Sequence, residues 1–492
     1  MKIRFIAVLT IVLVLFSGCK TAKREEIPSL RVLAGDLEMP GENAVVSKKL
    51  EEKLGIRLDY IESIWEKRHD KLEVLTSAGN TPDLFSYGYT YGDKVERLVN
   101  QNIVLDLSPY LNDYPNIKKR INEFEFIKSS NDGRVYFIPI KINDSDEYIL
   151  AEHAWFYRKD IIDSLGLELP RNAEEFYLFL KQIREKRPDS YPFTIESKYF
   201  LYAVFDLFDA RLTDYEMVDG KWRATAINDN MKQAVRFLKR LWDEGLLDRE
   251  FMLTPNWDNM FEKFLTGASP VIYTNYKYDK MAKLYAQRYP GSSPLDAIAY
   301  IPVMTNTSGE KRVSGTYNFY GGLYLKDDGN EALIRKRLEL ADYMLSPEGM
   351  LLMRYGVEGV HYEMRDGKPY SLLGQGSDGS TVRIRDIDGS ATIKALVNYD
   401  NLYVDDQTLY KDFITQMKAE YHRYAYVSKN YNNYLPSGGK GIDVMQLEDF
   451  AIDTIIRLIS ESGDFDAEWE EFKRQYNEKG GNKIAQYLTE NN

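Results

Sequence analysis

The feature that most restricts the fold of this chain is an alternation of strand-like and helix-like segments beginning near residue 30. Residues 30–34 form a short β-like run, and residues 43–54 have helical periodicity. Residues 56–60 then alternate with period two, a second helical pattern runs through Leu75, and residues 82–85 leave a turn as a further strand. Strands separated by helices of this length predict βαβ units, and hence a parallel sheet covered by helices.

Two later segments carry clear helical periodicity. The first is expected to begin at a cap near Asp229 and to end at Gly245, because apolar residues recur at helical spacing between them. The second rests on an apolar stripe that consists of Leu447, Ala451, Ile455, Leu458 and Ile459. Each helix is expected to turn one face toward a core.

The N-terminal segment has the pattern of an export signal. Lys2 and Arg4 precede an apolar run over residues 5–16, which is too short to cross a bilayer as a stop-transfer helix. Small residues, Ser17 and Gly18, follow this run. The chain is therefore expected to leave the cytoplasm.

Cys19, the only cysteine of the chain, comes directly after these small residues. The arrangement resembles the lipobox of bacterial lipoproteins, in which the cysteine is acylated with fatty acids such as palmitate, although Phe16 stands where that motif has a leucine. We expect a signal peptide over residues 1–18, a lipid anchor at Cys19 and a tether over residues 19–28. The alternative is a signal peptide that merely contains a cysteine.

Composition indicates a globular ectodomain without nucleic-acid partners. The chain has 492 residues, of which 44% are apolar and 28% charged, so it can bury a substantial core and form two or more domains. A net charge of −12 argues against a nucleic-acid surface, which would need a basic patch. With Cys19 acylated, no thiol is left for a disulfide, a zinc site or a nucleophile.

Aromatic residues are abundant, with 37 Tyr, 22 Phe and 6 Trp. Tyrosine and tryptophan combine a flat apolar face with one hydrogen-bond donor, which suits both protein interfaces and the apolar faces of sugar rings. The simplest interpretation is that most of them fill the core.

Short motifs follow one another in a set order through most of residues 30–365. They are GD at 35–36, KLEEKLGI at 49–56, AGNTPDL at 78–84, YRKDI at 157–161, LGL at 165–167, FLTG at 264–267, ADYMLSPEG at 341–349 and YGVEGVHY at 355–362. Their order resembles that of the extracellular solute-binding proteins of bacterial ABC importers, family 1, the family of maltose-binding protein. The last motif is similar to the large lipoprotein branch of that family in Gram-positive bacteria.

The resemblance implies an α/β fold of two lobes, the type II periplasmic-binding-protein-like fold, with a hinge and a ligand cleft between the lobes. The crossings would be residues 148–158 and 316–325. Lobe 1 would comprise residues 29–150 with 325–400, and lobe 2 residues 151–324 with 401–492.

The resemblance also implies a function and its partners. The protein would be a monomer on the outer face of the cell membrane, held there by its lipid anchor. It would capture an oligosaccharide or another small solute and deliver it to the membrane subunits of an ABC permease.

Four residues are carried over from the family by position. Asp36 stands where relatives use an acid to accept hydrogen bonds from sugar hydroxyls, although a turn or helix-capping role suits it equally. Tyr87 stands where a loop places an aromatic ring over a sugar. Glu196 and Tyr199 follow a strand much as an acid and a stacking tyrosine do in the family, with one extra residue between them.

Eight further ligand-binding candidates rest on location alone, because they fall on loops or crossings expected to face the cleft. They are Trp65, Tyr89, His153, Trp155, Tyr273, Tyr276, Tyr317 and Tyr320. His153 fits a hinge role equally well.

We expect no metal site. Many relatives carry a calcium loop after the helix that corresponds to residues 176–186, but residues 187–192 here lack the ladder of oxygen ligands and the glycine of such a loop. Residues 143–147 bunch their oxygen ligands too closely, and residues 386–389 supply too few.

Enzyme motifs are incomplete. Residues 374–379 match a dinucleotide fingerprint by letter, but residues 380–385 alternate as a strand where the fingerprint requires a helix N-terminus. Residues 438–441 lack the hydroxyl residue and the spacing of a phosphate loop, and no Gly-x-Ser-x-Gly elbow occurs. The four histidines include no close pair, which argues against a zinc hydrolase. We therefore predict a non-enzyme without catalytic residues or cofactor.

Two alternative functions stay open at this point. The 76 acidic residues supply many carboxylate pairs, so a secreted glycosidase is the alternative from the enzyme class. A sensor or adhesion lipoprotein would use the same cleft without transport.

Overall fold

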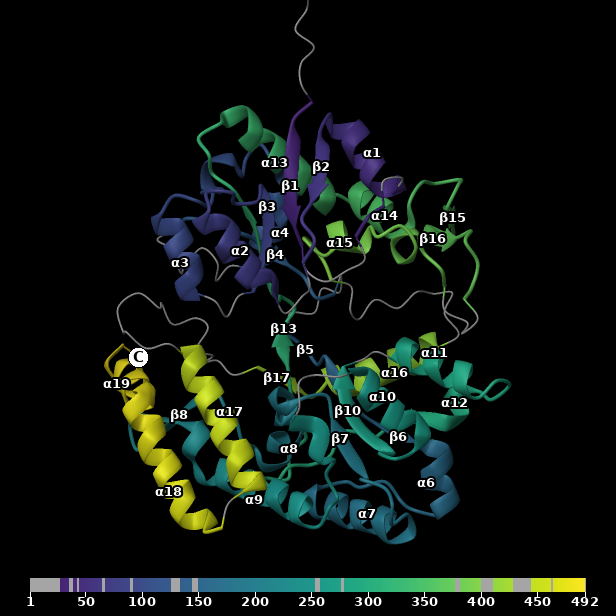
Figure 1. The fold of residues 1–492 in the computed structure, drawn as a ribbon, viewed down its shortest axis with the longest axis vertical. Helices are drawn as coiled ribbons and strands as arrows, with labels where there is room; N and C mark the ends of the chain where they lie inside the picture. The colour runs from purple at the N-terminus through teal and green to yellow at the C-terminus, as the bar shows by residue number, and fades with distance from the viewer. Residues whose placement is uncertain are drawn as a thin grey trace, which may run out of the picture.

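The computed structural model describes residues 27–34, 39–41, 44–63, 67–88, 92–124, 133–143, 149–252, 257–275, 278–376, 381–399, 410–427, 444–461 and 463–491. Within these ranges the chain forms two α/β lobes that lie one above the other and are joined near the middle of the molecule (Figure 1).

The sheet of lobe 1 has the order β2-β1-β3-β14-β4. The strands are β1 (Ser29–Leu33), β2 (Arg57–Tyr60), β3 (Leu84–Gly88), β4 (Ile138–Ile140) and β14 (Gly321–Leu325). β1 is parallel to both β2 and β3, which confirms the predicted parallel βαβ units. β14 enters antiparallel between β3 and β4, and local periodicity does not predict this insertion.

Helices cover this sheet, and a hairpin of two strands lies beside one of these helices, α14 (Pro347–Tyr355). The helices are α1 (Val45–Leu54), α2 (Arg68–Ser77), α3 (Gly92–Asn100), η2 (Ser108–Tyr110), α4 (Pro115–Asn122), α13 (Glu331–Leu345), α14 (Pro347–Tyr355), η7 (Ile384–Asp386) and α15 (Ala391–Lys394), and the hairpin is β15 (Tyr362–Arg365) with β16 (Lys368–Ser371). A buried ion pair attaches α13 to the sheet, because Arg337 Nη2 lies 2.6 Å from Asp83 and 2.5 Å from Asp328.

The sheet of lobe 2 has the order β11-β6-β10-β7. Its strands are β6 (His153–Arg158), β7 (Phe193–Ile195), β10 (Val271–Asn275) and β11 (Ile298–Tyr300). β7 and β10 are parallel, whereas β6 is antiparallel to β10 and to β11.

Most of the helices in the described part of the chain belong to lobe 2. They are α6 (Lys159–Leu165), α7 (Ala173–Lys186), η3 (Lys198–Phe200), α8 (Tyr202–Phe205), η4 (Asp206–Phe208), η5 (Thr225–Ile227), α9 (Asp229–Asp243), η6 (Arg249–Met252), α10 (Trp257–Thr266), α11 (Tyr278–Arg288), α12 (Pro294–Ala297), α16 (Lys411–His422), α17 (Val444–Ser460), α18 (Phe465–Tyr476), η9 (Asn477–Gly481) and α19 (Asn482–Asn491). A hairpin of β8 (Tyr215–Val218) and β9 (Lys221–Ala224) packs beside α19.

Both long helices that periodicity predicts are present in lobe 2. The cap of α9 is Asn228, one residue before the expected Asp229, and its side chain accepts a hydrogen bond from the Met231 N–H at 2.9 Å. Gly245 follows the helix with a φ of 66°, as a terminating glycine does. The predicted stripe of α17 is buried along its whole length.

Short strand pairs form the crossing between the lobes. β5 (Ile149–Leu150) pairs with β13 (Thr316–Tyr317), and β12 (Val313–Ser314) pairs with β17 (Ala425–Tyr426). The expected division placed residues up to 324 in lobe 2, but β14 pairs with β3 and β4, so the chain is back in lobe 1 by Gly321. A third passage, between Tyr399 and Tyr410, runs through residues outside the described part of the chain.

The strand predicted over residues 380–385 is absent from the described part of that segment, residues 381–385. Thr381 makes a single bridge to Gln375, and Ile384 begins the 3₁₀ turn η7. An alternating sequence forms a β-strand only when a neighbouring strand supplies hydrogen bonds along its length. The described residues of this segment make a single bridge of that kind.

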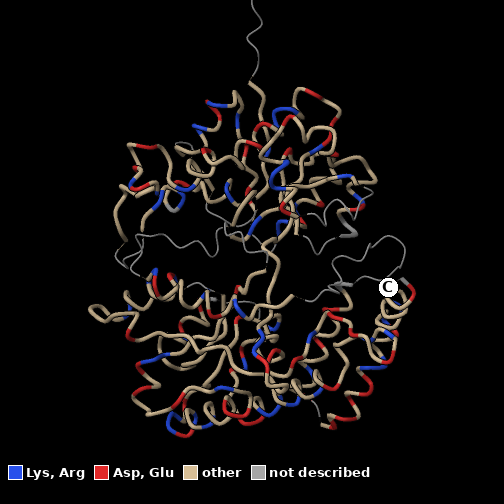
Figure 2. The backbone as a smooth tube through the Cα atoms, turned by 180° about the vertical axis from the view of Figure 1, so that it is seen from behind, with Lys and Arg blue, Asp and Glu red and all other residues tan. Residues whose placement is uncertain are grey.

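In the described part of the chain, no helix is both long enough and apolar enough to cross a membrane. Groups of three or more His, Cys, Asp or Glu side chains that could hold a metal ion are likewise absent from the described residues. Basic and acidic residues alternate over both lobes (Figure 2).

Candidate ligand-binding site

The ends of the central strands in both lobes lie next to the crossing. In lobe 1, Gly88 at the end of β3 pairs with Gly321, which comes shortly after the crossing strand β13. In lobe 2, Asn275 at the end of β10 pairs with His153, which comes shortly after the crossing strand β5. Ligands of open α/β sheets bind beyond the carboxyl ends of such strands, so the region around the crossing is the candidate site.

A pocket of about 330 Å³ opens on lobe 2 at this position. The start of β6, the turn after β7, the crossing strands and α17 supply its walls, and His153, Tyr199, Tyr202, Tyr317 and Tyr426 are among the lining residues. Its volume is at the lower end of the roughly 300–1,000 Å³ that ligand pockets occupy. The labels β5, β13 and β17 mark the nearby crossing (Figure 1).

His153 is held in a cluster of aromatic rings on the pocket wall. Its Nδ1 lies 3.0 Å from the Tyr202 hydroxyl, and its ring stacks on that of Tyr273 at a centroid distance of 5.7 Å. Phe200 packs against the same imidazole at 4.6 Å. The cluster orients His153 and Tyr202 toward the pocket before any ligand arrives.

Tyr199 stands at the rim of the pocket with 48% of its surface exposed. Its hydroxyl lies 3.5 Å from Asp449 Oδ1, and Lys198 Nζ lies 5.3 Å from the ring centre. Burial and the charge of Asp449 raise the pKa of Tyr199. Burial lowers the pKa of Lys198, but the hydrogen bond to Asp453 and the charges of Asp453, Asp449 and Tyr199 together raise it above its ordinary value.

Tyr317 and Tyr320 flank the return crossing. Tyr317, in β13, lines the pocket, whereas Tyr320 points its hydroxyl toward lobe 1, where it accepts a hydrogen bond of 2.8 Å from Arg68. The ring of Tyr320 meets that of Tyr399 edge-on at 5.1 Å. The two tyrosines therefore connect the crossing with the facing edges of both lobes.

Three of the predicted aromatic residues lie inside the lobes. Tyr87 is 1% exposed and contacts His69 at a centroid distance of 4.4 Å. Trp155 and Tyr273 are 4% and 1% exposed, and their rings pack against each other at 5.0 Å in the core of lobe 2. All three lie on central strands, which are covered on both faces, so alternation along the strand does not reveal which side chain faces a ligand.

Glu196 is also buried, at 5% exposure, directly after β7. Its Oε2 accepts a hydrogen bond of 2.8 Å from the Thr274 hydroxyl and one of 3.4 Å from the Asn275 N–H. In this structure the carboxylate holds the ends of β7 and β10 together. Asp36, Trp65, Tyr89, Tyr276 and the anchor Cys19 lie outside the described residues.

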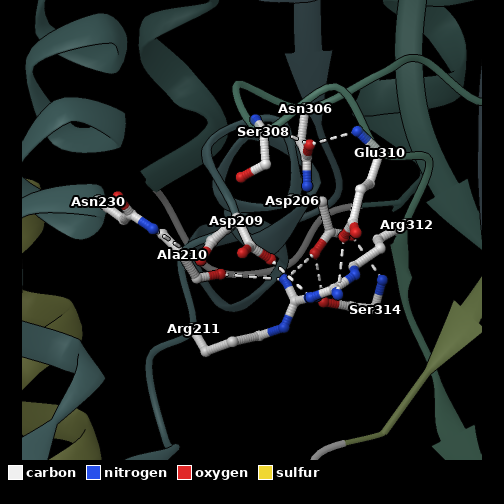
Figure 3. A network of polar contacts seen from close by, with 10 residues as sticks. All are labelled: Asp206, Asp209, Ala210, Arg211, Asn230, Asn306, Ser308, Glu310, Arg312 and Ser314. Carbon is white, nitrogen blue, oxygen red and sulfur yellow. Dashed lines mark hydrogen bonds and ion pairs between the residues drawn. The ribbon is translucent and has the colours of Figure 1, made fainter. Parts of the chain in front are cut away.

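A polar network behind the pocket was not predicted from the sequence. Asp206 accepts hydrogen bonds from the Ser314 N–H at 2.5 Å and from the Ser314 hydroxyl at 2.8 Å, and it pairs with Arg211 at 2.5 Å. Figure 3 shows these side chains converging together with Arg312 and Asp209. Burial raises the pKa of Asp206, while Arg211 and Ser314 oppose that rise. Because Ser314 belongs to β12, the network ties the pocket floor to the crossing.

Tyr426 and Glu448 are further pocket residues that the sequence did not identify. Tyr426, 39% exposed, has the guanidinium carbons of Arg211 and Arg312 at 5.4 and 5.3 Å from its ring centre. Burial, followed by the charge of Asp449, raises the pKa of Glu448 to about 7. Both residues come from the C-terminal part of the chain, where no motif marks them as functional.

Comparisons with known proteins agree with the two-lobed fold. The sequence model of a family described as bacterial extracellular solute-binding protein matches residues 37–351. A fructooligosaccharide ABC transporter substrate-binding protein of Streptococcus pneumoniae, FusA, is 24% identical, over 91% of this chain and 86% of that protein. Lipoprotein LipO of Bacillus subtilis is 24% identical, over 77% of this chain and 76% of its own length.

Among solved structures, the alginate-binding protein AlgQ2, determined without calcium ion, superposes with a TM-score of 0.73. The superposition covers 95% of this chain and 98% of that chain at 16% sequence identity. Similarity at this level of identity shows a shared two-lobed fold.

Proposed function

The chain belongs to the family of bacterial extracellular solute-binding proteins, and from this premise we propose that it captures an oligosaccharide for an ABC importer. The observation that carries the proposal is the pocket beside the crossing strands, where His153, Tyr199, Tyr202 and Tyr317 come together. Tyrosine rings offer apolar faces to a sugar, and the hydroxyl groups and carboxylates beside them exchange hydrogen bonds with sugar hydroxyls. The fructooligosaccharide relative supports this class of solute.

The arrangement of the lobes supports capture by closure. Each lobe has its own sheet and core, and the described connections between them are short strand pairs. Such a hinge lets one lobe bind the ligand before the other closes over it, and a permease can then recognise the closed form. Residues on the lobe 1 side, including Tyr320 and the carried-over Asp36, would complete the contacts.

We further propose that Cys19 anchors the protein to the outer face of the cell membrane. The lipobox-like sequence before Cys19 supports the anchor, as does the similarity to a Bacillus lipoprotein. Two or more acyl chains hold a protein stably, whereas a single chain gives only marginal binding. The variant Cys19→Ala should lose lipid labelling and either leave the membrane fraction or keep an uncleaved signal; labelling that persists would contradict the anchor.

The test of the binding proposal is a panel of oligosaccharides measured by thermal shift and by isothermal titration calorimetry. A ligand at a hundred times its dissociation constant should add about 2.7 kcal/mol to the stability of the native state. The bound sugar is then recovered and examined by chromatography. Unchanged sugar supports a binding protein, whereas hydrolysis products would show a glycosidase. Loss of uptake of the same sugar in cells that lack the chain separates transport from sensing.

A further inference from the structure

The charges around the lobe 2 pocket differ from those expected of a site for an acidic ligand. Three carboxyl side chains line the described walls, those of Glu152, Asp214 and Glu448, and the permanently charged cations among the lining residues are Lys198 and Arg211. An anionic ligand would need one of these two cations as its counter-ion, because a buried charge without a partner is costly. The existing partners of the two cations therefore determine which ligands fit.

Lys198 is already paired with a carboxylate. Its ammonium donates a hydrogen bond to Asp453 Oδ1 on α17. Asp449, one turn earlier on the same helix, lies 3.5 Å from the Tyr199 hydroxyl and adds to the negative charge around the ammonium. Hence α17 presents two carboxylates to one lysine at the rim of the pocket.

Arg211 is paired as well. Its Nη1 lies 2.5 Å from the buried Asp206 Oδ1 and also donates to the Ala210 carbonyl oxygen at 3.0 Å. The adjacent Arg312 pairs with Asp209 at 3.1 Å and with Glu310 at 2.7 Å (Figure 3). The carboxylates of this network therefore compensate the charge of both guanidinium groups, while Arg211 Nη2 is buried without a hydrogen-bond partner among the described residues.

We propose that the lobe 2 pocket binds a neutral sugar residue and discriminates against a uronate; this inference rests on the proposed function. A sugar without charge can use the tyrosine faces and can donate its hydroxyl protons to Glu152 and Glu448. A uronate carboxylate would lose its hydration beside the carboxylate of Glu152, at a site whose cations already have carboxylate partners. The net charge of −12 adds a longer-range repulsion.

The fold itself does not select between the two ligand classes. The chain shares its two-lobed fold with an alginate-binding protein, although alginate is a polymer of uronates. Side chains carried by the shared fold must therefore decide between neutral sugars and uronates. In this chain the ion pairs of Lys198 and Arg211 would make that choice.

The experiment compares neutral and acidic trisaccharides on the full chain by thermal shift and calorimetry. The neutral probes are kestose, maltotriose, cellotriose and xylotriose, and the acidic probes are trigalacturonate and trimannuronate. At least one neutral probe should bind, and each uronate should bind at least about tenfold more weakly than it. Oxidation of one primary hydroxyl of a bound hexose probe to a carboxylate supplies a matched acidic ligand, which should lose affinity by a similar factor.

A variant tests the cause of the discrimination. Asp453→Asn removes the partner of Lys198 and should raise uronate affinity about fivefold or more, while neutral-sugar affinity changes less than about twofold. The control is Asp243→Asn on α9, which also removes one carboxylate that pairs with a lysine but lies away from the pocket. It should raise neither the uronate affinity nor the neutral-sugar affinity. An equal gain in uronate affinity in both variants would show an effect of net charge alone and would overturn the role of the Lys198 pair.

The two proposals fail in different ways. Uronates bound as tightly as the neutral probes, or more tightly, would overturn the inference and leave the proposed function standing. If neither class shifts the unfolding temperature or gives a titration signal, the proposed function is contradicted and the inference falls with it.

Discussion

Glu448 is a pocket residue whose charge responds to pH near neutrality. Burial raises its pKa from the ordinary 4.5 to about 7, so between these values the folded protein keeps a proton that the unfolded chain has lost. The stabilisation that comes from keeping this proton is therefore fully present below about pH 4.5. It is lost as the pH rises to about 7, and the free energy of unfolding falls accordingly. Tyr215, Tyr476 and Asp449 are the groups that interact with this carboxyl.

We expect Glu448→Gln to stabilise the protein at pH 8 by about 1–2 kcal/mol, because the amide carries no charge to bury. At pH 4.5 the variant and the parent should be nearly equal in stability. Urea unfolding at the two pH values measures both differences. Glu461→Gln, an exposed change just after α17, is the matched control. A gain that is the same at both pH values would contradict the assignment.

Tyr199 and Trp155 illustrate how burial separates a binding role from a packing role. Tyr199→Ala removes a half-exposed ring at the pocket rim, so ligand affinity should fall by about 1–3 kcal/mol, roughly 5- to 150-fold, with stability little changed. Trp155→Ala empties a site between Phe176, Phe193 and Tyr273 and should cost about 3–5 kcal/mol of stability. Calorimetric titration and thermal unfolding of both variants test the contrast. Equal affinity in Tyr199→Ala and the parent would remove Tyr199 from the site.

The predicted ligand-binding residues show how much of the site can be inferred from the sequence alone. His153 and Tyr317 were singled out by their location and Tyr199 by its correspondence to the family, and these three line the same pocket. Tyr87, Trp155 and Tyr273 have the same chemistry and similar local sequence, but both faces of their strands are covered. Exposure depends on what packs above a strand, which is supplied by distant segments.

At the scale of elements, Asp206 connects the 3₁₀ turn η4 with the crossing strand β12. Asp206→Asn keeps the shape of the side chain but removes the charge that compensates Arg211 and weakens the bonds from Ser314. We expect a loss of about 2–4 kcal/mol in the free energy of unfolding, since the remaining guanidinium is mostly buried. Denaturant unfolding beside the surface control Asp243→Asn measures it. A loss no larger than that of the control would show that the pair is not stabilising.

The elements also differ in how well local patterns predict them. β1, α1, β2, α2 and β3 follow the alternation in the sequence, because each has its own periodicity and each βαβ crossover is short. β14 belongs to the same sheet, although it comes more than 200 residues after β3. Its antiparallel place between β3 and β4 depends on the chain having crossed to lobe 2 and returned.

At the scale of the whole molecule, the two lobes predict a ligand-dependent closure. Saturation with a neutral oligosaccharide that binds in the panel should reduce the radius of gyration in solution scattering, because closure brings the lobes together. Tyr199→Ala should require more ligand for the same change, since it weakens binding without touching the crossing strands. Identical scattering curves with and without a saturating ligand would contradict a closing clamp.

The sequence by itself determined the α/β class, the family resemblance and the positions of the long helices, because periodicity, caps and ordered motifs are local properties of the chain. Tertiary structure alone decided which side chains meet at the pocket. Tyr426 and Glu448 reach the wall of β6 and the crossing only through strand pairing and helix packing across the chain. Likewise, the pairing of Lys198 with Asp453 and of Arg211 with Asp206 follows from burial and proximity, which determine whether a charge is available to a ligand.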